Sequence, residues 1–288
     1  MSVLADLHTH TTASDGQYTP AELVRLAKQH GVQILAVTDH DTIDGVDEAQ
    51  RAGDALGLLV IRGVELSAKE HHNFHILGYG FQDGDTELSR LCAKLRAGRD
   101  DRKYQIVEFL REKGVDVALA EVEELAGGEV IGRPHFAQIL VKHGYVATNR
   151  EAFDRYLDTE DFRKRVKRFK ADARTCVEAI KSAGGKVSLA HPYQMGLPDD
   201  DLETLVAQLK DWGLDAIECY YPKYTPEQQK LYLYLAEKYK LRQTGGSDFH
   251  GEKVKPDVDL ARWPLELEWL MEPGHNSISN STPAAAAL

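Results

Sequence analysis

Short apolar segments alternate with amphipathic helical segments along most of this chain, and this alternation limits the folds that it can adopt. Seven segments have the length and the β-branched content of buried strands, and they span residues 3–8, 33–38, 58–65, 74–79, 186–190, 215–220 and 241–245. A helix start is visible at 19–22, with Thr19 as the N-cap and Glu22 closing a capping box. Strands that alternate with helices pair in parallel through crossover connections. The sequence therefore predicts an α/β fold, either a barrel or an open sheet.

Residues 88–170 interrupt this alternation with consecutive helical segments at 88–110, 119–125, 134–142 and 150–157. We interpret this stretch as a small all-helical insertion domain within a barrel domain formed by 1–87 and 171–272. Its end carries a basic run at 163–170. Such runs are usually solvated helix faces, and a rim that attracts phosphate is the alternative. The tail at 273–288 contains a run of alanines just before its end, and we expect it to be disordered.

Side chains that bind metals occur where the predicted strands end. They are His8, His10, Asp15, His40, Glu65, His75, His191, Asp248 and His250. The carboxyl ends of parallel strands share one face of an α/β fold, so these side chains are expected to meet there. His75 is the exception because it precedes most of its strand. Either that strand runs in the opposite direction, or the loop before it supplies the ligand.

The chemistry of this set predicts more than one metal ion. A His-x-His pair on an extended strand points both imidazoles to one face, as in His8 and His10. A single histidine at a strand end is usually a core or turn residue, but burying so many ionisable groups without compensation is costly. Mixed imidazole and carboxylate ligands suit manganese, iron or zinc. Six histidines exceed the needs of one ion, and Glu65 is placed to bridge two, an arrangement that clamps phosphate. Asp39 and Asp41 are expected to orient histidines.

Composition narrows the class of protein further. The net charge of −11 argues against broad nucleic-acid binding through a basic surface. It leaves room for an anionic substrate, because bound metal ions reverse the local field. Cys92, Cys176 and Cys219 lie far apart, so we expect a reducing cytoplasm and no disulfide framework. No apolar stretch is long enough to span a bilayer, and nothing indicates an obligate protein partner.

Five motifs together resemble one known family. They are Asp6-Leu7-His8-Thr9-His10, Thr38-Asp39-His40-Asp41, Gly63-Val64-Glu65, Ala190-His191-Pro192 and Gly246-Ser247-Asp248-Phe249-His250. In this combination the chain is similar to the PHP (polymerase and histidinol phosphatase) family from residue 3 to about 250, apart from the helical insertion. The resemblance implies a distorted seven-stranded (β/α) barrel and two or three divalent ions. It favours manganese, with zinc or iron as alternatives.

The resemblance also implies which residues share each ion. One ion would take His8, His10, Glu65 and Asp248; a second would share Glu65 and take His75 and His191; a third would take Asp15, His40 and His250. Some relatives have a histidine where Asp15 stands, which would alter the third site.

Within the family, the insertion motif Gly132-Arg133-Pro134-His135 resembles a stand-alone branch. Its members hydrolyse nucleoside 3′,5′-bisphosphates to the 5′-nucleotide, and some are 5′→3′ exonucleases on short RNA. The resemblance implies that Arg133 forks two hydrogen bonds to a phosphate. His135 or His191 would assist the leaving oxygen, with Asp248 completing the catalytic set. Arg99, Arg102 and Lys103 would hold the second phosphate, and a solvated helix face is the alternative for these three.

The sequence thus favours a phosphatase that removes the 3′-phosphate of a nucleoside 3′,5′-bisphosphate such as adenosine 3′,5′-bisphosphate. Three alternatives remain open. The chain would be a 5′→3′ exoribonuclease on short RNA, a histidinol-phosphate phosphatase that needs no second phosphate pocket, or a metal-binding module without activity.

Overall fold

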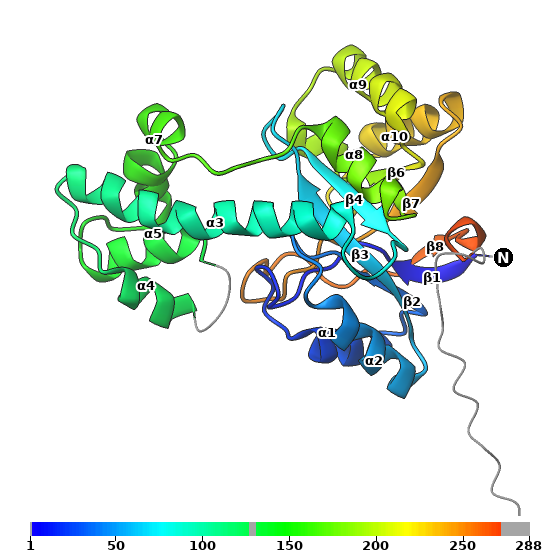
Figure 1. Ribbon diagram of the computed structural model, residues 1–288, viewed down its shortest axis with the longest axis horizontal. Coiled ribbons are helices and arrows are strands. Elements are labelled where there is room, and N and C mark those ends of the chain that lie inside the picture. Colours follow the sequence, from blue (N-terminus) through cyan, green and yellow to red (C-terminus); the bar gives the residue numbers. More distant parts are fainter. Residues whose placement is uncertain (1, 127–130, 272–288) are drawn as a thin grey trace, which may run out of the picture.

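Among the described residues, eight strands form one continuous sheet that curves into a nearly closed barrel (Figure 1). The structure is a computed structural model and describes residues 2–126 and 131–271. The strands are β1 (Val3–Asp6), β2 (Ile34–Val37), β3 (Leu59–Ser67), β4 (His75–Tyr79), β5 (Lys186–Leu189), β6 (Ala216–Tyr220), β7 (Arg242–Gly245) and β8 (Trp263–Leu265), in the order β7-β6-β5-β4-β3-β2-β1-β8. The expected α/β barrel and all seven expected strands are confirmed. The short β8 is an addition that the sequence pattern did not predict.

Strand β4 runs against its two neighbours, which places its first residue at the functional end of the barrel. The neighbouring pairs β1–β2, β2–β3, β5–β6 and β6–β7 are parallel, whereas β4 is antiparallel to both β3 and β5. In this register His75 lies opposite Ser67, two residues beyond Glu65. The opposite strand direction, one of the two explanations considered for His75, is therefore the correct one.

The barrel closes where the segments that follow β1 and β7 meet. The amide of Leu7 donates to the carbonyl of Gly245 (3.0 Å), that of Asp248 to His8 (2.8 Å), and that of His10 to Phe249 (2.9 Å). This contact requires a glycine at 246, since a Cβ there would lie 2.2 Å from the Cβ of His8. The backbones that carry His8, His10 and Asp248 are consequently hydrogen-bonded directly to one another.

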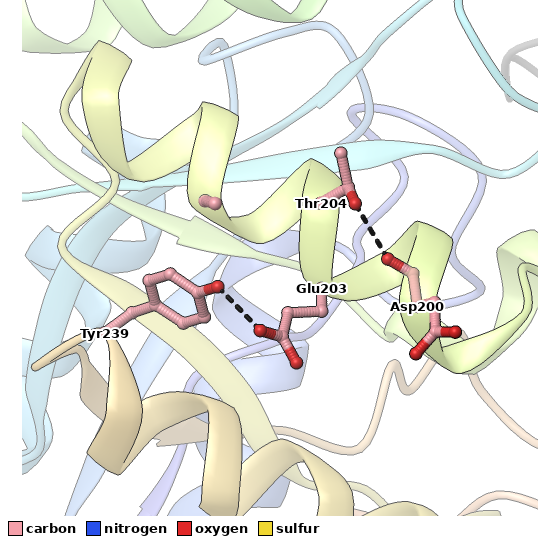
Figure 2. Close-up of a pocket in the computed structure, with 5 residues that line it drawn as sticks. Asp200, Glu203, Thr204 and Tyr239 are labelled. Carbon is pink, nitrogen blue, oxygen red and sulfur yellow. Dashed lines mark hydrogen bonds between the residues drawn. The ribbon is translucent and has the colours of Figure 1, made fainter.

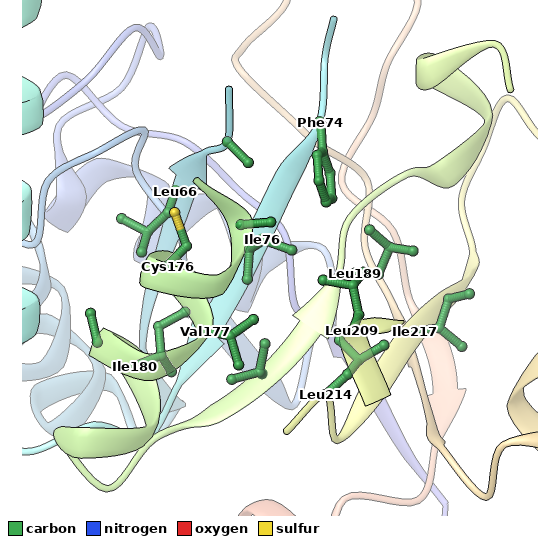
Figure 3. Close-up of a cluster of buried hydrophobic side chains, with 14 of the residues drawn as sticks. Leu66, Phe74, Ile76, Cys176, Val177, Ile180, Leu189, Leu209, Leu214 and Ile217 are labelled. Atoms are coloured by element: carbon green, nitrogen blue, oxygen red, sulfur yellow. The ribbon is translucent and has the colours of Figure 1, made fainter. Parts of the chain in front are cut away.

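In the described part of the chain, the outside of the barrel is covered by α1 (Pro20–Gln29), α2 (Val46–Leu56), α8 (Ala173–Ser182), α9 (Asp199–Trp212) and α10 (Pro226–Lys238). The expected capping box of α1 is present, with the Thr19 side chain accepting from the Glu22 amide. Figure 3 shows the packing of α8, whose Val177 and Ile180 face Ile76 of β4. Short 3-10 turns, η2 (Pro192–Met195) and η3 (Glu268–Leu270), complete this part of the chain.

The long helix α3 (Glu87–Glu112) connects two hydrophobic cores. Its first half contributes Leu88 and Leu95 to the core beside the barrel, and its second half contributes Phe109 to a separate core with Phe136 and Phe162. The second core also contains α4 (Leu119–Ala126), α5 (Arg133–Lys142), α6 (Asn149–Ala152), the π-helical η1 (Phe153–Leu157) and α7 (Glu160–Arg165). Figure 1 shows α3 extending from the barrel to these helices.

The domain limits at 88 and 170 remain a prediction. The expected disordered tail at 273–288 lies outside the described residues. None of the helices in the described ranges is long and apolar enough to cross a membrane.

Candidate metal centre

The residues singled out at strand ends converge on one end of the barrel. His8 and His10 follow β1, His40 follows β2, Glu65 lies in β3 and His75 begins β4. The other members come from the loop after His10 and from the segments after β5 and β7. Within each of four overlapping groups the ligand atoms lie within 4.8 Å of one another: His10, Asp15, His40 and His250; His8, Glu65 and His191; His8, His10 and Asp248; and His40, Glu65 and His75. All nine predicted ligand residues are thus brought together.

Glu65 is the centre of this ring and is fully buried. Its Oε1 lies 2.8 Å from His75 Nδ1 and 2.9 Å from His191 Nε2, and its Oε2 lies 2.8 Å from His40 Nδ1. Burial acts to raise the pKa of Glu65, but the neighbouring histidines, His40 first, hold that pKa well below its usual range. An ionised carboxylate with imidazoles at both oxygens has the geometry of a ligand that bridges two cations.

Several ring atoms lack hydrogen-bond partners, and this supports metal binding independently of the residue types. Among the described side chains, the buried atoms that make no hydrogen bond include His8 Nε2, both ring nitrogens of His10 and His191 Nδ1. His40 Nδ1 and Glu65 Oε2 lie 2.8 Å apart, but their orientation is not that of a hydrogen bond. Buried polar atoms are almost always paired, because an unsatisfied one costs about 1–3 kcal/mol. Divalent cations would accept these lone pairs, so the ring fits a multinuclear metal centre. The assignment of individual ions to residues remains a prediction.

Glu218 in β6 orients two of the ring histidines, and we did not predict it from the sequence. Its Oε1 lies 3.1 Å from His8 Nδ1, and its Oε2 accepts from the backbone amide of His191 (2.7 Å). Partners of this kind fix the orientation of metal-binding imidazoles. The sequence did contain a sign of its role, because Glu218 places a carboxylate within the apolar segment 215–220, where a buried charge requires a partner.

Glu218→Gln is expected to weaken divalent-metal affinity about 10- to 100-fold. An amide offers one acceptor oxygen in place of two, so either His8 or His191 loses its partner. Competition against a chelating indicator measures this affinity, with the exposed Glu237→Gln as the matched control. Equal affinities in both variants would show that Glu218 does not orient the ring.

Asp248 shares its two oxygens between the ring and the barrel wall. Its Oδ1 lies 3.3 Å from His10 Nε2, while its Oδ2 accepts from the Tyr221 hydroxyl (2.9 Å) and from the Lys255 ammonium (2.8 Å). Its backbone has a φ of 58°, and that of His191 has a φ of 23°. Residues other than glycine rarely adopt such angles, which cluster at functional sites.

No hydrogen bond among the described residues joins Asp39 or Asp41 to a histidine, so the prediction that they orient histidines is wrong. Asp39 accepts from the Thr11 amide (2.7 Å) and the Ser14 hydroxyl (2.6 Å), so it fixes the loop that carries Asp15. Asp41 instead accepts from the Ser67 amide (2.8 Å) and from Arg99 and Arg168. An aspartate side chain is short, so it reaches nearby backbone amides more readily than it reaches the imidazole of a neighbouring histidine.

Arginines from the insertion lie beside the ring. Arg99 Nε donates to Asp41 Oδ2 (2.8 Å), and Arg168 Nη1 donates to the same oxygen (3.0 Å). Burial lowers the pKa of Arg102 to about 10, and repulsion from Arg133, Arg168 and Arg99 adds to the effect. Arg99 and Arg133, two other predicted phosphate-binding residues, are thus near enough to Arg102 to repel its charge, and so is Arg168, which was not predicted individually.

The remaining candidates for substrate binding have different surroundings. Lys103 pairs with Glu123 of α4 (3.0 Å). Arg133 donates to Asp158 (2.7 Å). His135 Nδ1 accepts from the Gly132 amide (3.0 Å), an arrangement that leaves the ring proton on Nε2 as a donor. The substrate-binding and catalytic roles of these residues remain predictions.

A hollow on the surface is lined by Asp200, Glu203, Thr204, Ala207 and Tyr239 of α9 and the end of α10 (Figure 2). Its polar groups bond one another, as the Tyr239 hydroxyl donates to Glu203 (2.9 Å) and that of Thr204 to the Asp200 carbonyl (2.9 Å). It contains none of the predicted site residues, so the metal centre is the candidate functional site.

Comparison with known proteins agrees with this site. The PHP domain pattern matches residues 6–178. A 5′-3′ exoribonuclease from Haemophilus influenzae is 37% identical over 85% of this chain and 89% of its own length, and a 3′,5′-nucleoside bisphosphate phosphatase from Chromobacterium violaceum is 31% identical over 85% and 86%. A solved amidohydrolase structure from Chromobacterium violaceum, with bound SO4 and no metal, superposes with a TM-score of 0.77 at 30% identity over 91% of this chain and 92% of that one. The chain belongs to the PHP domain family and is a metal-dependent PHP phosphoesterase.

Proposed function

We propose that this protein is a 5′→3′ exoribonuclease that hydrolyses the phosphate ester at O3′ of the 5′-phosphorylated end of a short RNA. The observation that carries the proposal is the group of arginines beside the metal centre. These guanidinium groups would form a second phosphate-binding region beside the metal ions. The sequence alone favoured the bisphosphate phosphatase, but the exoribonuclease relatives are the more similar ones.

The metal centre would bind the phosphate that is cleaved, and the arginine group would bind the 5′-phosphate. The nine ring residues would hold divalent ions, which supply Lewis acidity to the phosphate and lower the pKa of a bound water. Arg102 and Arg133 would bind the 5′-phosphate, since guanidinium groups pair with phosphate oxygens in a fixed fork. The Nε2 proton of His135 would donate a hydrogen bond to a phosphate oxygen. Substrate held at both phosphates is cleaved one nucleotide from its 5′ end.

Hydrolysis of nucleoside 3′,5′-bisphosphates is the second candidate, and the same geometry supports it. Both reactions break a bond between phosphorus and O3′ next to a 5′-phosphate, and they differ only in whether the phosphate continues into another nucleotide. The Chromobacterium violaceum relative has this activity in its name. Histidinol phosphate carries a single phosphate, so an arginine group beside the centre favours the two nucleotide substrates over it.

The test compares a short RNA with a 5′-phosphate, the same RNA with a 5′-hydroxyl, and adenosine 3′,5′-bisphosphate, each with added manganese. We expect 5′-mononucleotides from the first RNA and about 100-fold slower release from the second, because hydrogen bonds to a charged group are lost. Release is followed by chromatography. Equal rates on both RNAs, or no release from any of the three, would contradict the proposal.

A further inference from the structure

The segment 166–171, which we call the return segment, leads from α7 back to the barrel and is fixed against it. Ala171 forms a parallel bridge with Ala68, and its carbonyl accepts from the Lys69 amide (3.0 Å), just past the end of β3. It also packs closely on α3, since a Cβ at Gly98 would lie 3.0 Å from the amide of Phe169. The backbone of the return segment is therefore held beside the strand that carries Glu65.

Only part of the basic run at 163–170 is a solvated surface. In its first half, Lys164 pairs with Glu160 (2.6 Å), and Arg165 pairs with Glu112, all at exposed positions. In its second half, which belongs to the return segment, the Arg168 side chain is 13% exposed and points inward to Asp41. The alternative of a phosphate-attracting rim is thus open only for this second half.

Arg168 and Arg99 share a single carboxylate oxygen. Both donate to Asp41 Oδ2, and Arg168 Nη2 donates to the Ser67 hydroxyl (3.0 Å). The single negative charge of Asp41 is thus shared between two guanidinium groups. Because Asp41 is itself held by the Ser67 amide (2.8 Å), the two guanidinium groups are fixed beside the metal centre before any substrate arrives.

Lys170 and Arg102 add to this excess of positive charge. Lys170 Nζ lies 3.4 Å from the carbonyl of Ala68. Burial lowers the pKa of Lys170 to about 8, with repulsion from Arg168, Arg99 and Arg102 contributing. Arg102 Nε is buried and has no hydrogen-bond partner among the described residues. Like charges crowded and partly desolvated in this way are destabilising unless an anion joins them.

We infer that Arg168 and Lys170 of the return segment complete, with Arg99, Arg102 and Arg133, the pocket that binds the 5′-phosphate of the substrate. This rests on the proposed function and adds two specificity residues to it. A phosphate dianion would supply the missing negative charge and would accept hydrogen bonds from several of these donors. The pocket is then built by three separate parts of the chain: α3, the start of α5, and the return segment.

The direct test is the binding of 5′-AMP to the folded protein, measured by isothermal titration calorimetry. Arg168→Met and Lys170→Met are each expected to weaken binding about 10- to 100-fold, because a hydrogen bond to a charged group is lost. Arg168→Lys keeps the charge and should recover part of the affinity. The matched control is Lys164→Met, from the exposed half of the same basic run, which should bind as the unmodified protein does.

A second readout is the ratio of kcat/KM for RNA with a 5′-phosphate to that for RNA with a 5′-hydroxyl, which should fall about 10-fold or more in both methionine variants. Thermal melting confirms that each variant is folded, and Lys170→Met decides if Arg168→Met fails to fold. If the variants bind 5′-AMP more weakly but the unmodified protein does not cleave RNA, the pocket is supported and the proposed function is refuted. If the unmodified protein cleaves RNA but the variants keep both the 5′-AMP affinity and the kcat/KM ratio, this inference is overturned.

Discussion

Glu65→Gln is expected to lower kcat/KM on a phosphate-ester substrate by about 10³-fold or more, which corresponds to several kcal/mol of lost transition-state stabilisation. Glu65 is fully buried and lies within 3.4 Å of ring nitrogens from His8, His10, His40, His75 and His191. The amide has nearly the shape of the carboxylate but has no charge with which to bridge two cations. The effect should therefore exceed that of losing any single histidine.

The matched control for this substitution is Glu227→Gln, on the exposed start of α10. It removes the same charge at a distance from the ring and should leave the activity unchanged. Steady-state kinetics at saturating manganese compares the two variants, with circular dichroism to confirm folding. A Glu65→Gln enzyme within 10-fold of the unmodified one would mean that Glu65 does not hold the ions that drive the reaction.

Divalent metal ions are expected to raise the melting temperature of the metal-stripped protein by about 10 °C. At a ligand concentration about 1,000 times the dissociation constant, binding to the native state adds about 4 kcal/mol, and each kcal/mol shifts the melting temperature of a large domain by about 2–4 °C. The physical cause lies in the buried ring atoms without partners, such as His8 Nε2 and both ring nitrogens of His10. Metal binding would satisfy them only in the folded state.

Scanning calorimetry with manganese, zinc or iron(II) added back to the chelator-treated protein measures this shift and ranks the three metals. The Glu65→Gln variant should show a much smaller shift, because its ring loses the central carboxylate. A melting temperature that no divalent ion changes would contradict the metal-centre account, whatever the outcome of activity assays.

The parts of this fold that local chemistry controls could be predicted from the sequence. Strand length and β-branched content located all seven predicted strands, and Thr19 with Glu22 located the start of α1. The ligand ring followed from one topological rule, that carboxyl ends of parallel strands share a face. That rule could not decide the direction of β4, because direction depends on which strands pair. It could not reveal β8, whose three residues include Pro264, an unusual residue in a strand.

Long-range contacts account for the site residues that the sequence did not reveal. Glu218 and Lys255 act on ring residues from the neighbouring β6 and from the loop after His250, and neither belongs to a recognisable motif. Arg168 was part of a run that looks like an ordinary solvated surface, and only the return of the chain to the barrel separates it from Lys164. The sequence drew attention to Asp41 by its position, but we predicted the wrong partners for it. Its partners Arg99 and Arg168 lie 58 and 127 positions further along the chain.

The central claim is that one ring of nine side chains holds a multinuclear metal centre for phosphate-ester hydrolysis. Its most direct test is a crystal structure of the manganese-loaded protein with anomalous diffraction data collected on both sides of the manganese absorption edge. We predict two or three anomalous peaks inside the ring, with at least one beside each oxygen of Glu65. A single peak would contradict this claim, and so would peaks that lie only outside the ring of nine side chains.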